Sequence, residues 1–164
     1  MIYYLWLIFI LVYLVAGKKL FYLLIMQSTL VNQQRFRILN SKDVYRIMQR
    51  MLARQCNIRA ELEYLWIIGL QTDNTIDFIE LHFTGSIDSN HIIPRELFRT
   101  AVLKNISKVI LVHNHFTGGV TPTRSDKEFT KYQIMAGDLL EVKVIDHLII
   151  SEKKYFSFAE KKLI

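Results

Sequence analysis

Apolar and polar residues follow two different periods after residue 40, which predicts a mixture of helices and strands. Ser41 is suited to cap a helix. Apolar residues then recur at helical spacing, namely Val44, Ile47, Met48, Met51 and Leu52. The apolar run at residues 62–70 predicts a strand. The polar triplet at 72–74 is typical of a turn, and residues 76–84 are predicted to be the hairpin partner.

The second half of the chain shows the same alternation. Pro94 favours the first position of a helix, and a long helix is predicted from about Thr123 to Gly137. Predicted strands are residues 108–112, ending at His113, residues 142–150, and residues 155–158. The pattern therefore predicts one α/β domain over residues 41–164, with residues 27–40 as an irregular lead-in.

Residues 1–26 form an apolar N-terminal segment unlike the rest of the chain. A first apolar run is followed by Lys18 and Lys19, and a second ends at Met26. A membrane helix needs about 20 apolar residues, and the lysine pair interrupts the longer span. Two interpretations stay open. Either residues 1–25 anchor the protein in a membrane, with the lysines keeping the domain in the cytoplasm, or Met26 is the true start. Both predict a cytoplasmic domain.

Composition excludes several classes of protein. The chain has 164 residues, of which 51% are hydrophobic and 22% are charged, so it can bury a core and is not disordered. Cys56 is the single cysteine, which excludes a disulfide framework and a cysteine-rich zinc site. The formal charge of +6 is too small to indicate nucleic-acid binding by itself. Any metal ion must therefore be held by histidine or carboxylate side chains.

The candidate chemistry is concentrated in residues 113–126, HNHFTGGVTPTRSD. His113 and His115 are two residues apart at the end of a predicted strand, so their side chains point to the same side. The glycine-rich loop can bring Asp126 back towards them. Two histidines and one carboxylate leave one position open for water, as in a catalytic zinc site. The spacing therefore predicts a site for one zinc ion.

A second interpretation of the same residues needs no metal. Thr123 and Asp126 fit a T-x-x-D capping signature, and the glycines and the proline are ordinary turn residues. Capping and metal binding are compatible, because one helix start can do both. Other hydrolase signatures are missing from the sequence. There is no H-E-x-x-H motif and no G-x-S-x-G motif, and a zinc deaminase would need a P-C-x-x-C partner.

The spacing H-x-H, seven residues, Ser/Thr, two residues, Asp resembles the JAMM motif of JAB/MPN metallopeptidase-like domains. The neighbouring segments are similar to the bacterial RadC-like branch: PRELF at 94–98, VILVHNH at 109–115, TPTRSD at 121–126, DHLII at 146–150 and YFSFAE at 155–160. The resemblance covers roughly residues 41–164. It implies a JAB/MPN-like, cytidine-deaminase-like α/β fold, in which a mixed sheet is flanked by helices.

The resemblance also implies roles for individual residues. The zinc ligands of the family fall on His113, His115 and Asp126, and the serine that supports the oxyanion falls on Thr123. The family's general base, which acts on the attacking water, matches Glu63 best, at the start of a predicted strand. Other carboxylates compete for this role, namely Glu61, Glu80 and Glu96. The chain has HNHFTG where the family usually has HNHPSG, so Phe116 stands in the place of a proline.

Three further polar residues are expected to be structural. Asn114 should point away from the histidines into a hydrogen bond. His147 is expected to be a core histidine or to lie behind the ligands, and Asp146 to play a structural role at a strand end. His82 and His91 show no partner pattern.

The predicted function is that of a zinc-dependent hydrolase, a metallopeptidase or isopeptidase-like enzyme that acts on a peptide or isopeptide substrate. The alternative is an inactive MPN scaffold that binds partners, associated with DNA repair through the family's name. Nucleic acid is a weakly supported partner, because no basic stripe with interleaved aromatic residues stands out.

Overall fold

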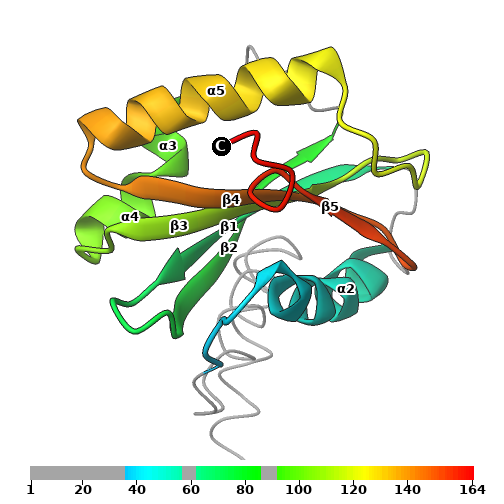
Figure 1. Ribbon diagram of the computed structural model, residues 1–164, viewed down its shortest axis with the longest axis horizontal. Helices are drawn as coiled ribbons and strands as arrows, with labels where there is room; N and C mark the ends of the chain where they lie inside the picture. Colours follow the sequence, from blue (N-terminus) through cyan, green and yellow to red (C-terminus); the bar gives the residue numbers. More distant parts are fainter. Residues whose placement is uncertain (1–35, 57–61, 86–91) are drawn as a thin grey trace, which may run out of the picture. The chain divides into compact units, whose positions relative to one another are not determined.

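The computed structural model describes residues 36–56, 62–85 and 92–164 (Figure 1). The predicted N-terminal segment, most of the predicted lead-in, and the candidates Glu61 and His91 lie outside these ranges. Among the described residues, no helix has the length and apolar character needed to cross a membrane.

A mixed five-stranded sheet forms the centre of the described domain. Its strands are β1 (Glu63–Leu70), β2 (Ile76–Gly85), β3 (Lys108–Asn114), β4 (Lys143–Ile150) and β5 (Tyr155–Ser157). They lie in the order β2-β1-β3-β4-β5. Only β3 and β4 run parallel, and a helix connects them. The predicted hairpin is confirmed as β1 and β2, and the predicted α/β class with helices flanking a mixed sheet is confirmed as well.

Helices cover both faces of the sheet (Figure 1). Helix α2 (Ser41–Cys56) packs on one face, and α3 (Pro94–Leu97), α4 (Arg99–Leu103) and α5 (Arg124–Leu139) pack on the other. Side chains of β3 alternate between the two. Val109 and Leu111 belong to the core under α5, whereas Ile110 and Val112 belong to the core under α2. Both faces of β3 are therefore buried, as expected for a central strand.

Two local predictions need correction. Asn40, and not Ser41, caps α2, because its Oδ1 accepts a hydrogen bond from the amide of Asp43 at 3.1 Å. The hydroxyl of Ser41 instead donates to Asp146. Strand β3 does not end before the histidines but continues through His113 to Asn114, since β1 and β4 pair with it on both sides.

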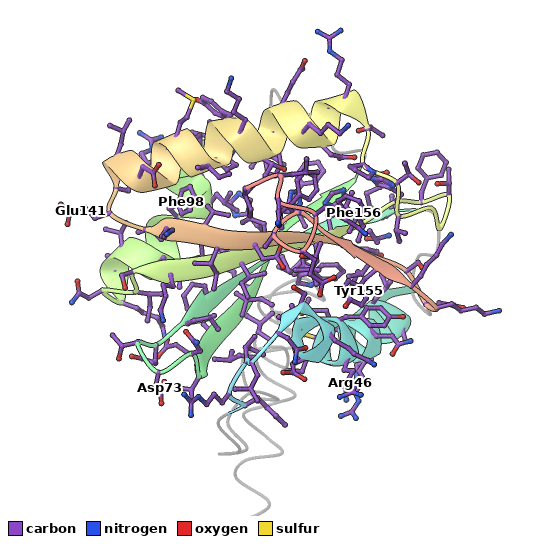
Figure 2. All side chains as sticks on the ribbon, in the orientation of Figure 1. Arg46, Asp73, Phe98, Glu141, Tyr155 and Phe156 are labelled. Atoms are coloured by element: carbon purple, nitrogen blue, oxygen red, sulfur yellow. The ribbon has the colours of Figure 1, made fainter. Side chains whose placement is uncertain are left out.

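The C-terminal part of the domain closes the edge of the sheet. Strand β5 pairs with β4, and Tyr155 packs against Tyr45 of α2 with ring centroids 4.9 Å apart (Figure 2). Phe156 meets Phe158 edge-to-face, and Phe158 is fully buried on the α5 side. The aromatic residues at the end of the chain thus pack on both faces of the sheet.

A register shift in β4 decides which way its polar residues face. Val109 of β3 pairs with Val144, but Ile110 pairs with Asp146, so Ile145 is an extra residue in β4. A single extra residue inverts the alternation of side chains that follow it. Asp146 therefore faces α2 and His147 faces α5, where Val144 also packs.

Candidate metal centre

His113 and His115 converge at the carboxyl end of the central strand. His113 belongs to β3 and is buried, and His115 follows two residues later, so both rings lie on the α5 side. Their Nε2 atoms are 3.1 Å apart. The turn after them is closed by the amide of Gly118, which donates to the carbonyl of His115 at 2.9 Å, and Gly118 has a φ of 69°. This left-handed conformation suits glycine because it has no Cβ.

Asp126 reaches the two histidines from the first turn of α5. The side chain of Thr123 accepts a hydrogen bond from the amide of Asp126, and Asp126 Oδ2 accepts from the amide of Thr123 at 2.7 Å, which completes a capping box. The Thr123 hydroxyl also donates to Oδ2 at 2.7 Å. The same carboxylate places Oδ1 3.2 Å from His113 Nε2 and Oδ2 3.2 Å from His115 Nε2. Capping and ligand placement are thus combined in one residue.

The electrostatics of the cluster favour an ionised carboxylate. Burial opposes ionisation of Asp126, but its contacts with His113, His115 and Thr123 outweigh burial and hold its pKa well below the usual range. The hydrogen bond with Asp126 raises the pKa of His115, against the opposing effect of burial. A negative charge therefore lies between two rings, where a cation is stabilised.

The donor set fits a zinc ion. The three ligand atoms lie within 4.8 Å of one another, and the closest approaches are the 3.1 Å and 3.2 Å distances given above. Two atoms bound to one tetrahedral zinc ion at about 2.0–2.1 Å lie roughly 3.3 Å apart. Two imidazoles and one carboxylate are also ligands that zinc uses in catalytic sites. His113, His115 and Asp126 could therefore hold the ion with little rearrangement.

Glu63 lies beside this cluster because of the pairing between β1 and β3. Leu65 pairs with His113, so Glu63, two residues earlier in the antiparallel strand, lies next to the position opposite His115 and on the same face. Its charge contributes to the raised pKa of His115, and its Oε1 lies 3.5 Å from the amide of Phe116. The register thus brings the predicted base to the predicted ligands.

The other described carboxylates lie elsewhere. Glu80 pairs with Ile67, four residues further along β1, which is about 13 Å at 3.3 Å per residue. Glu96 is in α3 and contacts Arg95. Burial lowers the pKa of His82 and outweighs the negative charges of Glu80 and Glu96, which raise it. Among the described candidates for the base, Glu63 is therefore the one that the fold places at the cluster.

Asn114, between the two histidines, anchors the strand that carries Glu63. Its Oδ1 accepts from the amide of Tyr64 at 2.9 Å, and its Nδ2 donates to the carbonyl of Leu62 at 3.2 Å. The prediction that Asn114 points away from the histidines into a structural hydrogen bond is confirmed. These two bonds hold the backbone on either side of Glu63.

His147 lies directly behind the cluster and is fully buried. Its Nε2 is 2.8 Å from Nδ1 of His113, and its Nδ1 is 2.6 Å from the hydroxyl of Thr130. Burial lowers the pKa of His147 well below its usual value, and the neighbouring His113 lowers it further. The expectation that His147 lies in the core behind the ligands is confirmed.

Sequence comparison assigns the chain to a family. A family model described as the RadC-like JAB domain matches residues 38–163, which is most of the chain. The chain belongs to the RadC-like JAB domain family. Among curated relatives, it is 34% identical over 128 residues to a UPF0758 protein of Chlorobaculum parvum, covering 78% of this chain and 55% of the relative.

Two further relatives show the same pattern of partial coverage. The chain is 37% identical over 122 residues to a UPF0758 protein of Thermotoga maritima, covering 74% of this chain and 52% of the relative. It is 40% identical over 101 residues to one of Chloroflexus aurantiacus, covering 62% and 44% respectively. The chain thus spans about half the length of the curated relatives that it matches.

Sequence reasoning missed Thr130. It lies one helical turn after Asp126 on α5 and is buried against His147. The only signal in the sequence is this four-residue spacing, which places Thr130 on the same face of the helix as Asp126. Phe116 is also notable, because it is 66% exposed in the loop that follows His115.

Proposed function

We propose that this RadC-like JAB domain is a zinc-dependent hydrolase of the JAMM type, a metallopeptidase or isopeptidase-like enzyme. The observation that carries the proposal is the convergence of His113 Nε2, His115 Nε2 and an Asp126 oxygen at 3.1–3.2 Å. Membership in the RadC-like JAB domain family supports it, and so does the resemblance of the spacing of the three residues to the JAMM motif. One zinc ion per chain is the proposed cofactor.

In the proposed mechanism the residues of the site have different tasks. His113, His115 and Asp126 would hold the ion, which would supply Lewis-acid activation of water and of a carbonyl group. Glu63 takes a proton from the attacking water and returns it to the leaving amine, as a general base and then a general acid.

Thr123 is the proposed donor to the oxyanion. Its hydroxyl donates to Asp126 Oδ2, so this proton must turn towards the substrate during the reaction. The capping bond from the amide of Asp126 to the Thr123 hydroxyl can persist, since it uses the oxygen as acceptor.

The proposed substrate is an amide of a peptide or isopeptide. The site lies at the carboxyl end of β3, beside an exposed aromatic ring at Phe116. An exposed aromatic side chain at this point can pack against a substrate side chain and thereby contribute to specificity. Phe116→Ala is therefore expected to raise KM more than it lowers kcat.

Metal content of the full 164-residue chain tests the proposal first. Elemental analysis after purification without chelators should find about one zinc per chain, and His113→Ala, His115→Ala and Asp126→Asn should each lose it. His82→Ala is a matched control, because His82 lies in β2 outside the cluster. Wild-type protein without metal, even after zinc is supplied, would contradict the proposal and favour the alternative of a scaffold that acts by binding partners.

Activity tests the base separately from the metal. Glu63→Gln should keep one zinc per chain and lose hydrolysis of any peptide or isopeptide that the wild type cleaves. Glu80→Gln is the control, because Glu80 lies further along the sheet. Full activity in Glu63→Gln would show that another group activates the water.

A further inference from the structure

The geometry behind the cluster of His113, His115 and Asp126 determines which atom donates and which accepts in each hydrogen bond. The Thr130 hydroxyl is 2.6 Å from the main-chain carbonyl of Asp126 and 2.6 Å from Nδ1 of His147. A carbonyl oxygen can only accept a hydrogen bond, and a hydroxyl has one proton to donate. The hydroxyl of Thr130 therefore donates to the carbonyl and must accept a hydrogen bond from the N–H at Nδ1 of His147.

This requirement sets the tautomer of His147. The ring is fully buried and contacts no carboxylate oxygen among the contacts described for it, so burial keeps it neutral. A neutral imidazole with its proton on Nδ1 has a lone pair on Nε2. That Nε2 is 2.8 Å from His113 Nδ1, so Nδ1 of His113 must be the donor.

The hydrogen bond that His113 donates to His147 also sets the tautomer of His113. A neutral His113 that donates from Nδ1 has no proton on Nε2. This lone pair points to His115 Nε2 at 3.1 Å and Asp126 Oδ1 at 3.2 Å. We propose that Thr130 and His147 are positioning residues, which hold His113 in the tautomer that presents an unprotonated Nε2 to a metal ion. The inference rests on the proposed metal site.

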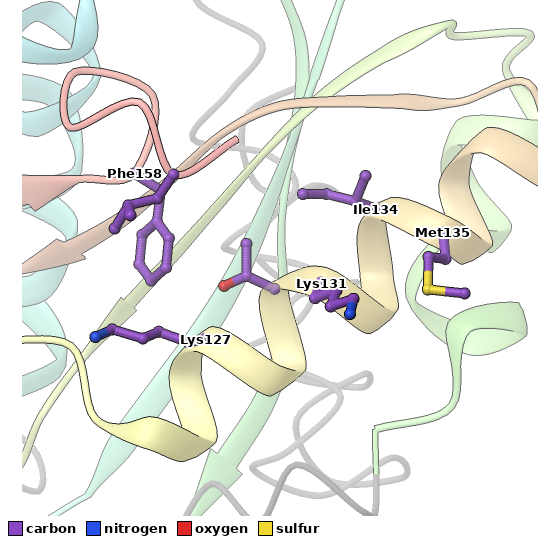
Figure 3. Close-up of a pocket in the computed structure, with 7 residues that line it drawn as sticks. Lys127, Lys131, Ile134, Met135 and Phe158 are labelled. Carbon is purple, nitrogen blue, oxygen red and sulfur yellow. The ribbon is translucent and has the colours of Figure 1, made fainter.

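The hydrogen-bonded chain from Thr130 through His147 to His113, called the relay below, packs against aromatic side chains. The ring of Phe158 stacks on His147 with centroids 4.9 Å apart, and Phe129 meets it at its edge. Phe158 and Thr130 also line the pocket between α5 and the C-terminal segment, together with Lys127 and Lys131 (Figure 3). Thr130 is nonetheless only 2% exposed and His147 is fully buried, so both partners of this hydrogen bond lie largely out of contact with solvent.

The relay forms a closed loop around one turn of α5. The hydrogen bonds start at the main-chain carbonyl of Asp126 and pass through Thr130 and His147 to His113, whose unprotonated Nε2 lies 3.2 Å from the carboxylate of the same Asp126. One residue thus supplies both the acceptor that sets the polarity and a ligand for the ion. Hydrogen bonds from a partner behind the ligand typically orient metal-binding histidines and raise their basicity.

Nuclear magnetic resonance of the metal-free wild-type chain tests the tautomers directly. Long-range correlations between ring protons and nitrogens distinguish protonated from unprotonated imidazole nitrogens. We expect His113 and His147 each to carry the proton on Nδ1 before any metal is added. A metal-free His113 with its proton on Nε2, in a wild type that binds zinc, would overturn the relay and leave the metal site intact.

Zinc affinity of variants measures the effect of the relay. His147→Leu removes the acceptor for His113 Nδ1 and should weaken zinc binding about 10–100-fold. His147→Gln should restore most of the affinity, because its Oε1 can accept from His113 while its amide donates to Thr130. Thr130→Val should weaken binding, whereas Thr130→Ser should not.

Equal affinity in His147→Leu and wild type would overturn the proposal. If His147→Leu does not fold, the tautomers of the wild type and the zinc affinities of Thr130→Val and Thr130→Ser still test the proposal. Failure of the wild type to bind zinc would instead overturn the proposed function, and the relay would then have no ion to serve.

Discussion

Two buried carboxylates lie on opposite faces of the same sheet and are satisfied in different ways. Asp146 faces α2, where it accepts from the hydroxyls of Ser41 and Ser157 and from the amides of His147 and Ala159, at 2.7–3.0 Å. All four donors are neutral and belong to the protein. This Asp146 cluster is therefore complete without any ion.

The Asp126 cluster on the α5 face is not complete in the same sense. Asp126 receives two bonds from Thr123, but its remaining near neighbours are ring nitrogens of His113 and His115. If His113 Nε2 carries no proton, two acceptors face each other at 3.2 Å, which is repulsive unless a proton or a cation lies between them. Burial of a carboxylate therefore does not by itself identify a metal site. What distinguishes Asp126 from Asp146 is that its neighbours include ring nitrogens, which can be acceptors, whereas all neighbours of Asp146 are donors.

The largest expected effect is on folding stability at the Asp146 cluster. Asp146→Ala removes the acceptor of four donors, two of them in the buried residues His147 and Ser157, and should lower the free energy of unfolding by about 3 kcal/mol. Asp126→Ala in metal-free protein should cost only about 1 kcal/mol, because it loses a helix cap but also relieves the crowded acceptors. Urea denaturation measures both variants, and equal losses would break the comparison.

Zinc binding at the Asp126 cluster should stabilise the protein, and this gain should not depend on the Asp146 cluster. At a free zinc concentration of about 100 times Kd, the free energy of unfolding should rise by about 2.7 kcal/mol. Asp126→Asn should abolish this gain, and a chelator should reverse it in the wild type. Ser157→Ala weakens the Asp146 cluster and should keep the gain. Thermal unfolding with and without zinc measures these differences, and a similar gain in Asp126→Asn would place the ion elsewhere.

Asn114 connects the two faces, because it lies between the ligand histidines but bonds to β1 on the α2 side. Asn114→Ala removes two hydrogen bonds, one with the amide of Tyr64 and one with the carbonyl of Leu62, and should lower the free energy of unfolding by about 2 kcal/mol. It should keep one zinc per chain, as its side chain does not face the ion. Hydrolysis should fall, since Glu63 loses the support of its strand. Loss of zinc together with stability would show that Asn114 also shapes the metal site.

The smallest expected effect concerns a single donor. Ser41→Ala removes one of the four donors to Asp146 and should lower the free energy of unfolding by about 1 kcal/mol, with zinc affinity unchanged. Asn40→Ala should cost a similar amount through loss of the cap of α2. Chemical denaturation and zinc titration on the same samples compare the two. A change in zinc affinity in Ser41→Ala would mean that the two faces are coupled.

Local pattern predicted much of the fold because the relevant forces act within a few residues. The hairpin of β1 and β2, the central strand before the histidines and the helix α5 follow from apolar periodicity and turn residues. The cap of α2 was predicted one residue late, since Asn40 and Ser41 are both good caps and only the contact of Ser41 with Asp146 separates them. The break between α3 and α4 at Phe98 had no signal in the pattern, where Pro94 indicated only the start of a helix.

The sequence by itself determined the candidate ligands. His113 and His115 share a side of one strand, and Asp126 starts the next helix, so short-range geometry brings them together. The pattern also indicated that Asn114 points the opposite way. These conclusions need only the periods of a strand and of a helix.

Only the tertiary structure decided what surrounds the ligands. Glu63 lies beside His115 because of the register between β1 and β3, which joins residues about fifty positions apart. His147 faces the ligands, and Asp146 faces away, because one extra residue at Ile145 inverts the alternation of β4. Pairing register and a bulge depend on contacts between distant segments, and no local pattern encodes them.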